Sequence, residues 1–106
     1  MKLDTTDKIR TVTASLFGMR YRPLPGFGID LRTAVEDTLA EFNAVKCGES
    51  GSPAYEVNNE YFRIGRRRIR LCTEDEREVS LWGPKRLVDQ VYAAIVEKLK
   101  SRRCIL

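Results

Sequence analysis

The arginine run at residues 66–68 separates two short apolar patterns that cannot share one regular β-strand. Before the run, Phe62 and Ile64 occupy even positions. After it, Ile69 and Leu71 occupy odd positions. Because side chains alternate between the two faces of a strand, a regular strand would turn one of these pairs away from the core. The chain must therefore change phase at the arginines.

Two local structures would accommodate this change of phase. The first is a β-bulge within one long bent strand, in which Gly65 supplies backbone angles that other residues rarely adopt. The second is a tight turn at residues 65–67, which would make four strands out of three. Because tight turns usually carry Asn, Asp or a second Gly rather than three arginines, we expect the long bent strand.

The alternation on either side of the run predicts two antiparallel pairings. A turn at residues 59–60 would set Val57 opposite Phe62 on the core face. On the other face it would set Glu56 opposite Arg63, so that both faces agree in character. The expected strands therefore form an antiparallel meander.

The second pairing joins the strand after the arginines to the segment that ends at Trp82. The favoured register sets Leu71 opposite Val79 and closes through an acidic loop at residues 74–76. On the opposite face this register places Arg68 beside Trp82. We therefore predict a cation–π contact between the Arg68 guanidinium and the Trp82 indole.

Helical periodicity is clearest in two segments. Asp30 is suited to cap the first, which extends toward Lys46; residues 47–53 then break the pattern and begin the β region. Pro84 suits the first position of the second, residues 84–103. The apolar face of the first comprises Leu31, Ala34, Val35, Thr38, Leu39 and Phe42, and that of the second comprises Val88, Val91, Tyr92, Ile95 and Leu99.

The N-terminal part leaves its secondary structure open. Residues 9–17 have apolar side chains at helical spacing but are also rich in β-formers, so a helix is expected and a strand is nearly as favourable. Residues 19–29 contain two prolines and two glycines and are expected to form a connector. The predicted fold is α+β: a three-stranded, or with the turn four-stranded, antiparallel meander against two or three helices, in the order α-α-β-β-β-α.

Length and composition indicate one ordinary domain. The chain has 106 residues, of which 42% are hydrophobic and 32% charged, so we expect a single domain over residues 1–106. Within it we expect an N-terminal part (1–29), a core (30–101) and a basic tail (102–106). No apolar run approaches the roughly 20 residues of a membrane span. Acidic residues stand where a secretory signal has its apolar segment, which favours a cytoplasmic location.

The residue types needed for most catalytic chemistry are missing. The chain has no histidine, the commonest general base and metal ligand. Its three cysteines, at positions 47, 72 and 104, are far apart and form no CxxC pair. We therefore predict no metal, no cofactor, no disulfide scaffold and no enzymatic activity. Cys72 would share a face with Arg68 and Arg70, which would lower its pKa.

Positive charge is concentrated in the second half of the chain. Residues 61–106 carry 12 basic and six acidic residues, whereas residues 31–60 carry two basic and six acidic ones. Arginine suits phosphate and aromatic surfaces better than lysine does. We predict nucleic-acid binding, with RNA ahead of DNA. The candidate site residues are Arg63, Arg66, Arg67, Arg68, Arg70, Trp82, Lys85 and Arg86.

Two other interpretations of the same surface remain open. The arginines could belong to a solvated sheet face, paired with the acidic residues of the neighbouring strands and loop. Alternatively, the exposed face or an edge strand could bind a partner protein or a second copy of the chain. Binding to phosphate weakens steeply with salt, whereas an apolar or edge-strand interface does not.

The predicted order of residues 31–101 resembles the double-stranded-RNA-binding domain. Residues 38–46 look similar to the end of that family's first helix, and residues 52–57 to the entry of its first strand. Lys85 and Arg86 stand at the start of its last helix. The family's Gly-Pro-x-His loop is absent, and larger apolar residues replace the lysine and small alanines of its last helix. The resemblance is one of topology, and it implies RNA binding.

Overall fold

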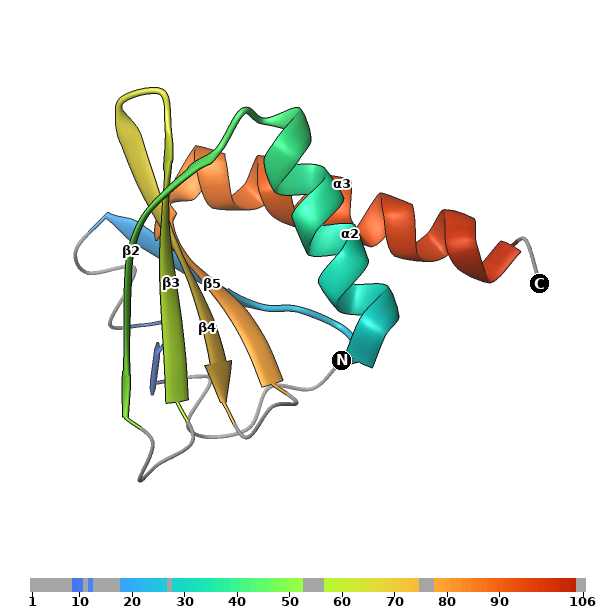
Figure 1. Cartoon of the computed structure of the whole chain (residues 1–106), viewed down its shortest axis with the longest axis horizontal. Coiled ribbons are helices and arrows are strands. Elements are labelled where there is room, and N and C mark those ends of the chain that lie inside the picture. The colour runs from blue at the N-terminus through green and yellow to red at the C-terminus, as the bar shows by residue number, and fades with distance from the viewer. Residues whose placement is uncertain are drawn as a thin grey trace.

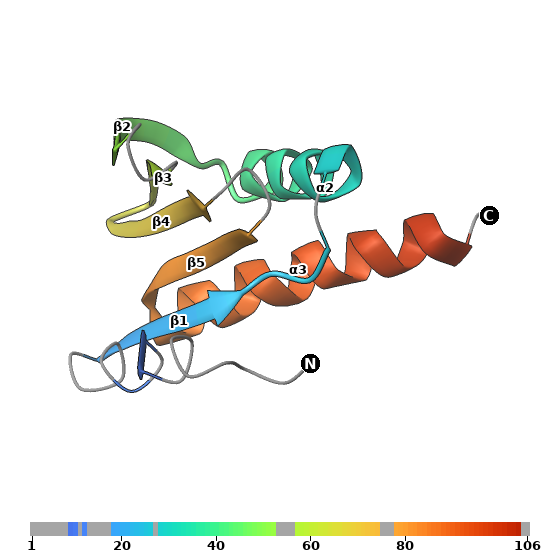
Figure 2. The same cartoon turned by 90° about the horizontal axis from the view of Figure 1, so that it is seen from below.

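In the part of the chain that the structure describes, the strands form one antiparallel sheet, and the two long helices lie on the same side of it (Figures 1 and 2). The computed structural model describes residues 9–10, 12, 18–26, 28–52, 57–74 and 78–104. For residues 102–104 it describes the backbone only. Its elements are β1 (Met19–Pro23), α2 (Gly28–Glu41), β2 (Val45–Ser52), β3 (Val57–Ile64), β4 (Arg67–Glu74), β5 (Glu78–Pro84) and α3 (Lys85–Cys104).

The sheet has five strands in the spatial order β1-β5-β4-β3-β2. Strands β2 to β5 form a meander, and β1 pairs with β5 at one edge. The predicted order α-α-β-β-β-α is therefore wrong, since the described order is β-α-β-β-β-β-α. The topological resemblance to the double-stranded-RNA-binding domain is wrong as well, because it was based on the order α-β-β-β-α and residues 28–104 have four strands between the helices.

Two of the strands lie in segments that were not expected to be strands. Residues 19–23, assigned to a connector, form β1, and Pro23 is tolerated as its last residue because β1 is an edge strand. Residues 45–52, expected to end a helix and introduce the β region, form β2. The expected N-terminal helix has helical backbone at Ile9, Arg10 and Val12, and its other residues lie outside the described part of the chain.

The arginine run contains a turn and not a bulge. Ile64 pairs with Arg67, so Gly65 and Arg66 are the two central residues of a β-hairpin. Gly65 has a φ of 62°, which fits a turn with glycine at its first central position and needs no Asn or Asp. The long bent strand was therefore the wrong choice, and the tight turn that the sequence also allowed is present.

The predicted turn at residues 59–60 does not exist, because both residues lie in the middle of β3. Val57 pairs with Ser52 on one side and Glu74 on the other, and not with Phe62. Glu56 lies outside the described residues. Once the phase change is a turn, the β3 residues pair across it with β4, which removes the need for an earlier hairpin.

The register between β4 and β5 is displaced by two residues from the predicted one. Leu71 pairs with Leu81 and Thr73 with Val79. Glu74 and Glu78 form the last pair, so the connection occupies residues 75–77 and not the expected 74–76. This shift of the loop changes every cross-strand partner while keeping each side chain on its expected face.

An asparagine two residues beyond Glu41 terminates helix α2. Asn43 has a φ of 56°, and the Ala44 N–H donates to the Leu39 carbonyl at 2.9 Å while the Asn43 N–H donates to the Ala40 carbonyl at 3.1 Å. This pair of bonds is a Schellman motif, in which Asn tolerates the left-handed conformation. The helix therefore stops before the segment that was expected to extend it to Lys46.

The apolar faces of both helices pack together and against the sheet, as their periodicity predicts. Val88, Val91 and Ile95 of α3 are completely buried. The other buried core residues are Leu24, Leu31, Ala34, Val35, Leu39, Ile69, Leu71, Leu81 and Leu87. Within the described residues, no helix is long and apolar enough to cross a membrane.

Candidate binding surface

The sheet has an outer face, directed away from both helices, that is defined by the strand registers. Tyr61 of β3 pairs with Arg70 of β4, which pairs with Trp82 of β5, which pairs with Tyr21 of β1. Gly48 of β2 completes this row beside Tyr61. The registers place on the outer face Met19, Tyr21, Pro23, Val45, Gly48, Ser50, Ser52, Val57, Asn59, Tyr61, Arg63, Arg68, Arg70, Cys72, Glu74, Glu78, Ser80, Trp82 and Pro84. Of these, Tyr21, Cys72 and Ser80 are buried.

Arg63 and Arg68 lie directly opposite each other on the outer face. Both side chains are exposed. Among the described residues, no carboxylate lies within 4.0 Å of either guanidinium, although ion pairs occur elsewhere in the structure. Like charges directly opposite each other on a sheet destabilise the pair of strands. An anion held between the two arginines would relieve this repulsion.

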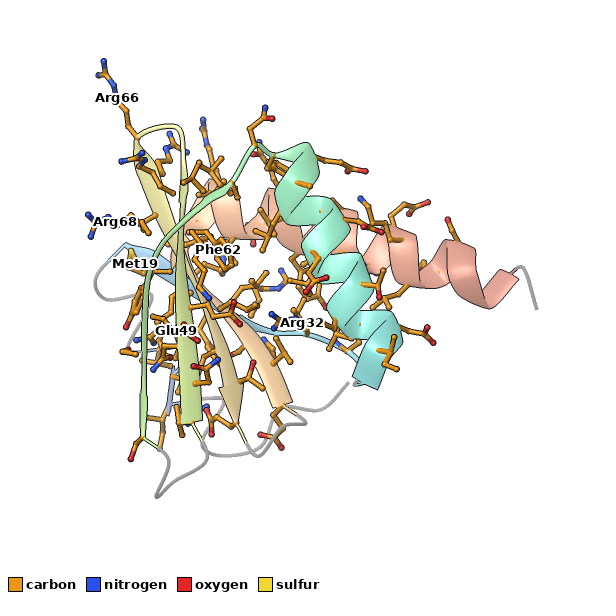
Figure 3. All side chains as sticks on the ribbon, in the orientation of Figure 1. Met19, Arg32, Glu49, Phe62, Arg66 and Arg68 are labelled. Carbon is orange, nitrogen blue, oxygen red and sulfur yellow. The ribbon has the colours of Figure 1, made fainter. Side chains whose placement is uncertain are left out.

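Four of the other predicted basic residues lie at the same end of the sheet as this pair. Arg66 extends away from the turn (Figure 3), and Arg67 pairs with Ile64 on the helix side of the hairpin. Lys85 and Arg86 are exposed at the start of α3, directly after β5. This region, which we call the hairpin end, comprises Arg63, Arg66, Arg67, Arg68, Lys85 and Arg86.

Arg70, and not Arg68, makes the cation–π contact with the only tryptophan. The Arg70 guanidinium carbon lies 4.6 Å from the centroid of the Trp82 ring. The predicted partner was wrong because of the shift in register, although Arg68 does lie on the same face, one row nearer the turn. Tyr21 contacts the Trp82 ring as well, with 4.6 Å between centroids. The indole is half-buried and already has two partners.

The acidic residues of β4 and β5 lie at the opposite end of the strands from the hairpin end. Glu74 pairs with Glu78 across the strands, six residues along β4 from Arg68. Arg10 donates a hydrogen bond to Glu74 at 2.6 Å and lies 5.8 Å from the Tyr21 ring centroid. The outer face therefore carries positive charge at one end and acidic side chains at the other. Among the described residues, these acidic groups do not neutralise Arg63 or Arg68.

Cys72 lies on the outer face but has a pKa opposite to the expected one. Burial raises the pKa of its thiol, and the nearby Glu74 carboxylate raises it further, while Arg70 and Arg10 only partly compensate. The residue is 6% exposed. Because the thiolate is the reactive form, Cys72 is not an activated nucleophile.

This difference gives an expected order of thiol reactivity. In a Cys104→Ser variant, we expect exposed Cys47 to react with Ellman's reagent at least about tenfold faster than Cys72 at neutral pH. The reaction of Cys72 should accelerate as pH rises toward its raised pKa. Mass spectrometry of the modified peptides measures both rates, with denatured protein as the control in which the two rates should converge. Equal rates in the native protein would contradict this assignment.

The sequence interpretation missed the apolar part of the outer face. Met19 and Val45 are 37% and 53% exposed; Val45 pairs with Arg63, and Met19 pairs with Pro84 of the strand next to Arg68. They were missed because their strands were assigned to other structures. It also missed Arg20 and Arg22, which turn to the helix side, where Arg22 lies 3.9 Å from the Tyr92 ring centroid.

On the helix side, the described residues form an apolar cleft. It has a volume of about 340 Å³ and lies between α2 and strands β4 and β5, lined chiefly by Leu31, Val35, Leu71 and Val79. None of the predicted site residues lines it. Among the described residues, no three acidic or cysteine side chains are grouped as metal ligands.

The fold and surface together define an α+β protein with a five-stranded antiparallel sheet, helices on one face and an arginine-bearing outer face. Comparison of the chain with protein-family models, curated protein sequences and solved structures finds no match.

Proposed function

We propose that the protein is a non-catalytic nucleic-acid-binding module of the cytoplasm, with RNA ahead of DNA as its ligand. The observation that carries the proposal is the pair Arg63 and Arg68, exposed and directly opposite each other with no carboxylate among the described residues to neutralise them. Arg66, Arg67, Lys85 and Arg86 would add to the field around this pair, and Arg70 with Trp82 would support it from the next row.

The positive charge and N–H donors of the hairpin end are complementary to the negative charge and oxygen acceptors of a phosphate backbone. Each guanidinium offers several N–H donors in a planar fork that fits phosphate oxygens. Binding of several arginines to a polyanion releases condensed counterions, which favours association at low salt. RNA is placed first because proteins recognise it chiefly in unpaired segments, which can lie across the exposed part of a sheet face, here the hairpin end.

Affinity measured at several salt concentrations tests the proposal. We expect a fluorescently labelled RNA of mixed sequence to bind in an anisotropy titration at about 50 mM salt. If four of the arginines each contact a phosphate, the slope of log K against log salt should be about −2.8. A DNA of the same sequence should bind more weakly. Absence of binding to either ligand at about 50 mM salt would refute the proposal.

A partner protein is the second candidate, and the exposed edge of the sheet favours it. Strand β2 is the last strand in the sheet order and is eight residues long, and the structure describes no strand on its outer side. Such an edge can pair with another strand, including the β2 of a second copy. A dimer that forms with rising concentration in light scattering, and that persists at about 0.5 M salt, would support this candidate.

A further inference from the structure

The arginine pair is flanked on the outer face by two exposed apolar side chains. Val45 of β2 pairs directly with Arg63. On the other side of the pair, Met19 of β1 pairs with Pro84 of β5, and Pro84 stands two residues beyond Trp82 on the same face as Arg68. Figure 3 shows Met19 and Arg68 directed away from the helices, whereas Phe62 lies on the helix side. One row of the outer face therefore has two cationic groups at its centre and apolar groups on both sides.

Three of the four neighbouring positions in this row are paired across strands, and Arg68 with Pro84 continues the β4–β5 register one step beyond its last pair, Arg70 and Trp82. With about 4.8 Å between paired strands, a row across five strands spans about 19 Å. In the order of the strands, the row reads Met19, Pro84, Arg68, Arg63 and Val45. It has cations at its centre for phosphates and an apolar side chain at each end. A ligand that follows the row must therefore present charge and apolar surface side by side.

Resting on the proposed function, we infer that the ligand is a single-stranded nucleic acid lying across this row. The outside of a duplex presents phosphates and sugars, and its base faces are stacked inside, where Met19 and Val45 could not reach them. An unpaired strand exposes the flat apolar faces of its bases next to its phosphates. Arg63 and Arg68 hold the phosphates, and Met19 and Val45 pack against bases on either side.

The contacts of Trp82 are consistent with a strand that lies across the row of the arginine pair. Its ring already contacts Arg70 and Tyr21, so the indole supports the neighbouring row and is not itself the surface on which a base stacks. The apolar contacts with bases come from aliphatic side chains, which have no hydrogen-bonding groups to read base edges. Binding is therefore expected to depend on strandedness more than on sequence.

A comparison of single and double strands tests the inference. The ligands are one labelled RNA of twelve nucleotides, either alone or annealed to its complement. We expect the single strand to bind at least about tenfold more tightly than the duplex, although the duplex carries more phosphates. The double variant Met19→Ser/Val45→Ser should bind the single strand about fivefold more weakly and leave duplex binding unchanged.

A matched control separates this effect from a general loss of apolar surface. Ile29 is 83% exposed and belongs to α2, which lies on the helix side of the sheet (Figure 2), so Ile29→Ser should leave both affinities unchanged. Thermal unfolding of each variant checks that the fold persists, and Met19→Leu/Val45→Ile should retain binding to the single strand.

Duplex binding as tight as single-strand binding, or an equal loss for both ligands in the double variant, would overturn the inference while leaving the proposed function standing. Failure of both RNAs to bind would instead overturn the proposed function.

Discussion

Removal of Arg63 and Arg68 together is expected to weaken RNA binding roughly 15-fold at about 0.15 M salt. Two phosphate contacts on a single strand account for about 1.4 of the slope of log K against log salt, and this contribution produces the loss in affinity. The double variant Arg63→Ala/Arg68→Ala should therefore also halve the slope, from about −2.8 to about −1.4. Anisotropy titrations at four salt concentrations measure both quantities.

A second double variant controls for net charge. Lys98 and Lys100 lie near the far end of α3 from the hairpin end, and Lys98→Ala/Lys100→Ala removes the same two charges. We expect this variant to change the affinity for RNA by less than about threefold, because it alters only the long-range electrostatic potential of the protein. If it weakens binding as much as the arginine variant does, the hairpin end is not the binding site.

The folded state should not lose stability when the arginine pair is removed. Both side chains are exposed, and their mutual repulsion is relieved in the double variant. Its urea midpoint is therefore expected to equal or exceed that of the unmodified protein. Loss of binding with retained stability would show that these arginines serve binding and not folding.

Loss of Arg32 is expected to produce a large destabilisation. The Glu60 side chain is only 6% exposed, and its carboxylate accepts a hydrogen bond from Arg32 Nη1 at 3.0 Å, with Lys46 Nζ at 3.6 Å. Arg32→Ala would leave this buried carboxylate with Lys46 alone. Breaking a fully buried pair costs about 3–5 kcal/mol. Because the Arg32 side chain is 52% exposed, we expect a loss of about 2 kcal/mol in the free energy of unfolding.

Two further variants identify the cause of this loss. Arg32→Ala/Glu60→Leu removes the unpaired carboxylate as well and should recover most of the stability. Lys98→Ala breaks the surface pair with Glu41, whose atoms lie 2.7 Å apart, and should cost no more than about 0.5 kcal/mol. Urea unfolding provides all three values. A loss for Arg32→Ala no larger than that for Lys98→Ala would contradict the role assigned to Glu60.

The helices could be predicted from the sequence because their signals are local. Each apolar face repeats at helical spacing, and the predicted buried residues, such as Leu31, Val35 and Ile95, are buried in the structure. The end of α2 was less predictable. Asn43 is a recognised residue for a helix end, but the apolar and helix-forming residues around it mask that signal.

The edge strands could not be predicted because nothing local specifies them. β1 ends in proline and precedes a Pro/Gly-rich segment, and β2 is rich in glycine and serine. Both are poor strand sequences, and pairing with β5 and β3 in the folded sheet overrides that weakness. The pairing of β1 with β5 joins segments about 60 residues apart, such as Tyr21 and Trp82. Patterns within a short window contain no information about such a contact.

The sequence predicted on which face of the sheet the candidate site residues lie, but not their cross-strand partners. Alternation alone placed Arg68, Arg70 and Trp82 on the side away from the core, as the structure has them. Their cross-strand partners depend on where the connection between β4 and β5 begins, and a shift of one residue in its position moves the register by two residues and places Arg70 instead of Arg68 beside Trp82. The opposition of Arg63 and Arg68 depends on the turn at Gly65.

The central claim is that the hairpin end of the outer face binds nucleic acid, and an NMR titration of the labelled protein with single-stranded RNA tests it most directly. We expect the backbone amides of residues 63–70 and the Nε–H signals of Arg63 and Arg68 to shift progressively, together with the Trp82 indole signal. The amides of α2 should shift little. A titration at about 50 mM salt in which no signal moves, or in which the shifts lie on the helices and spare the hairpin end, would contradict the claim.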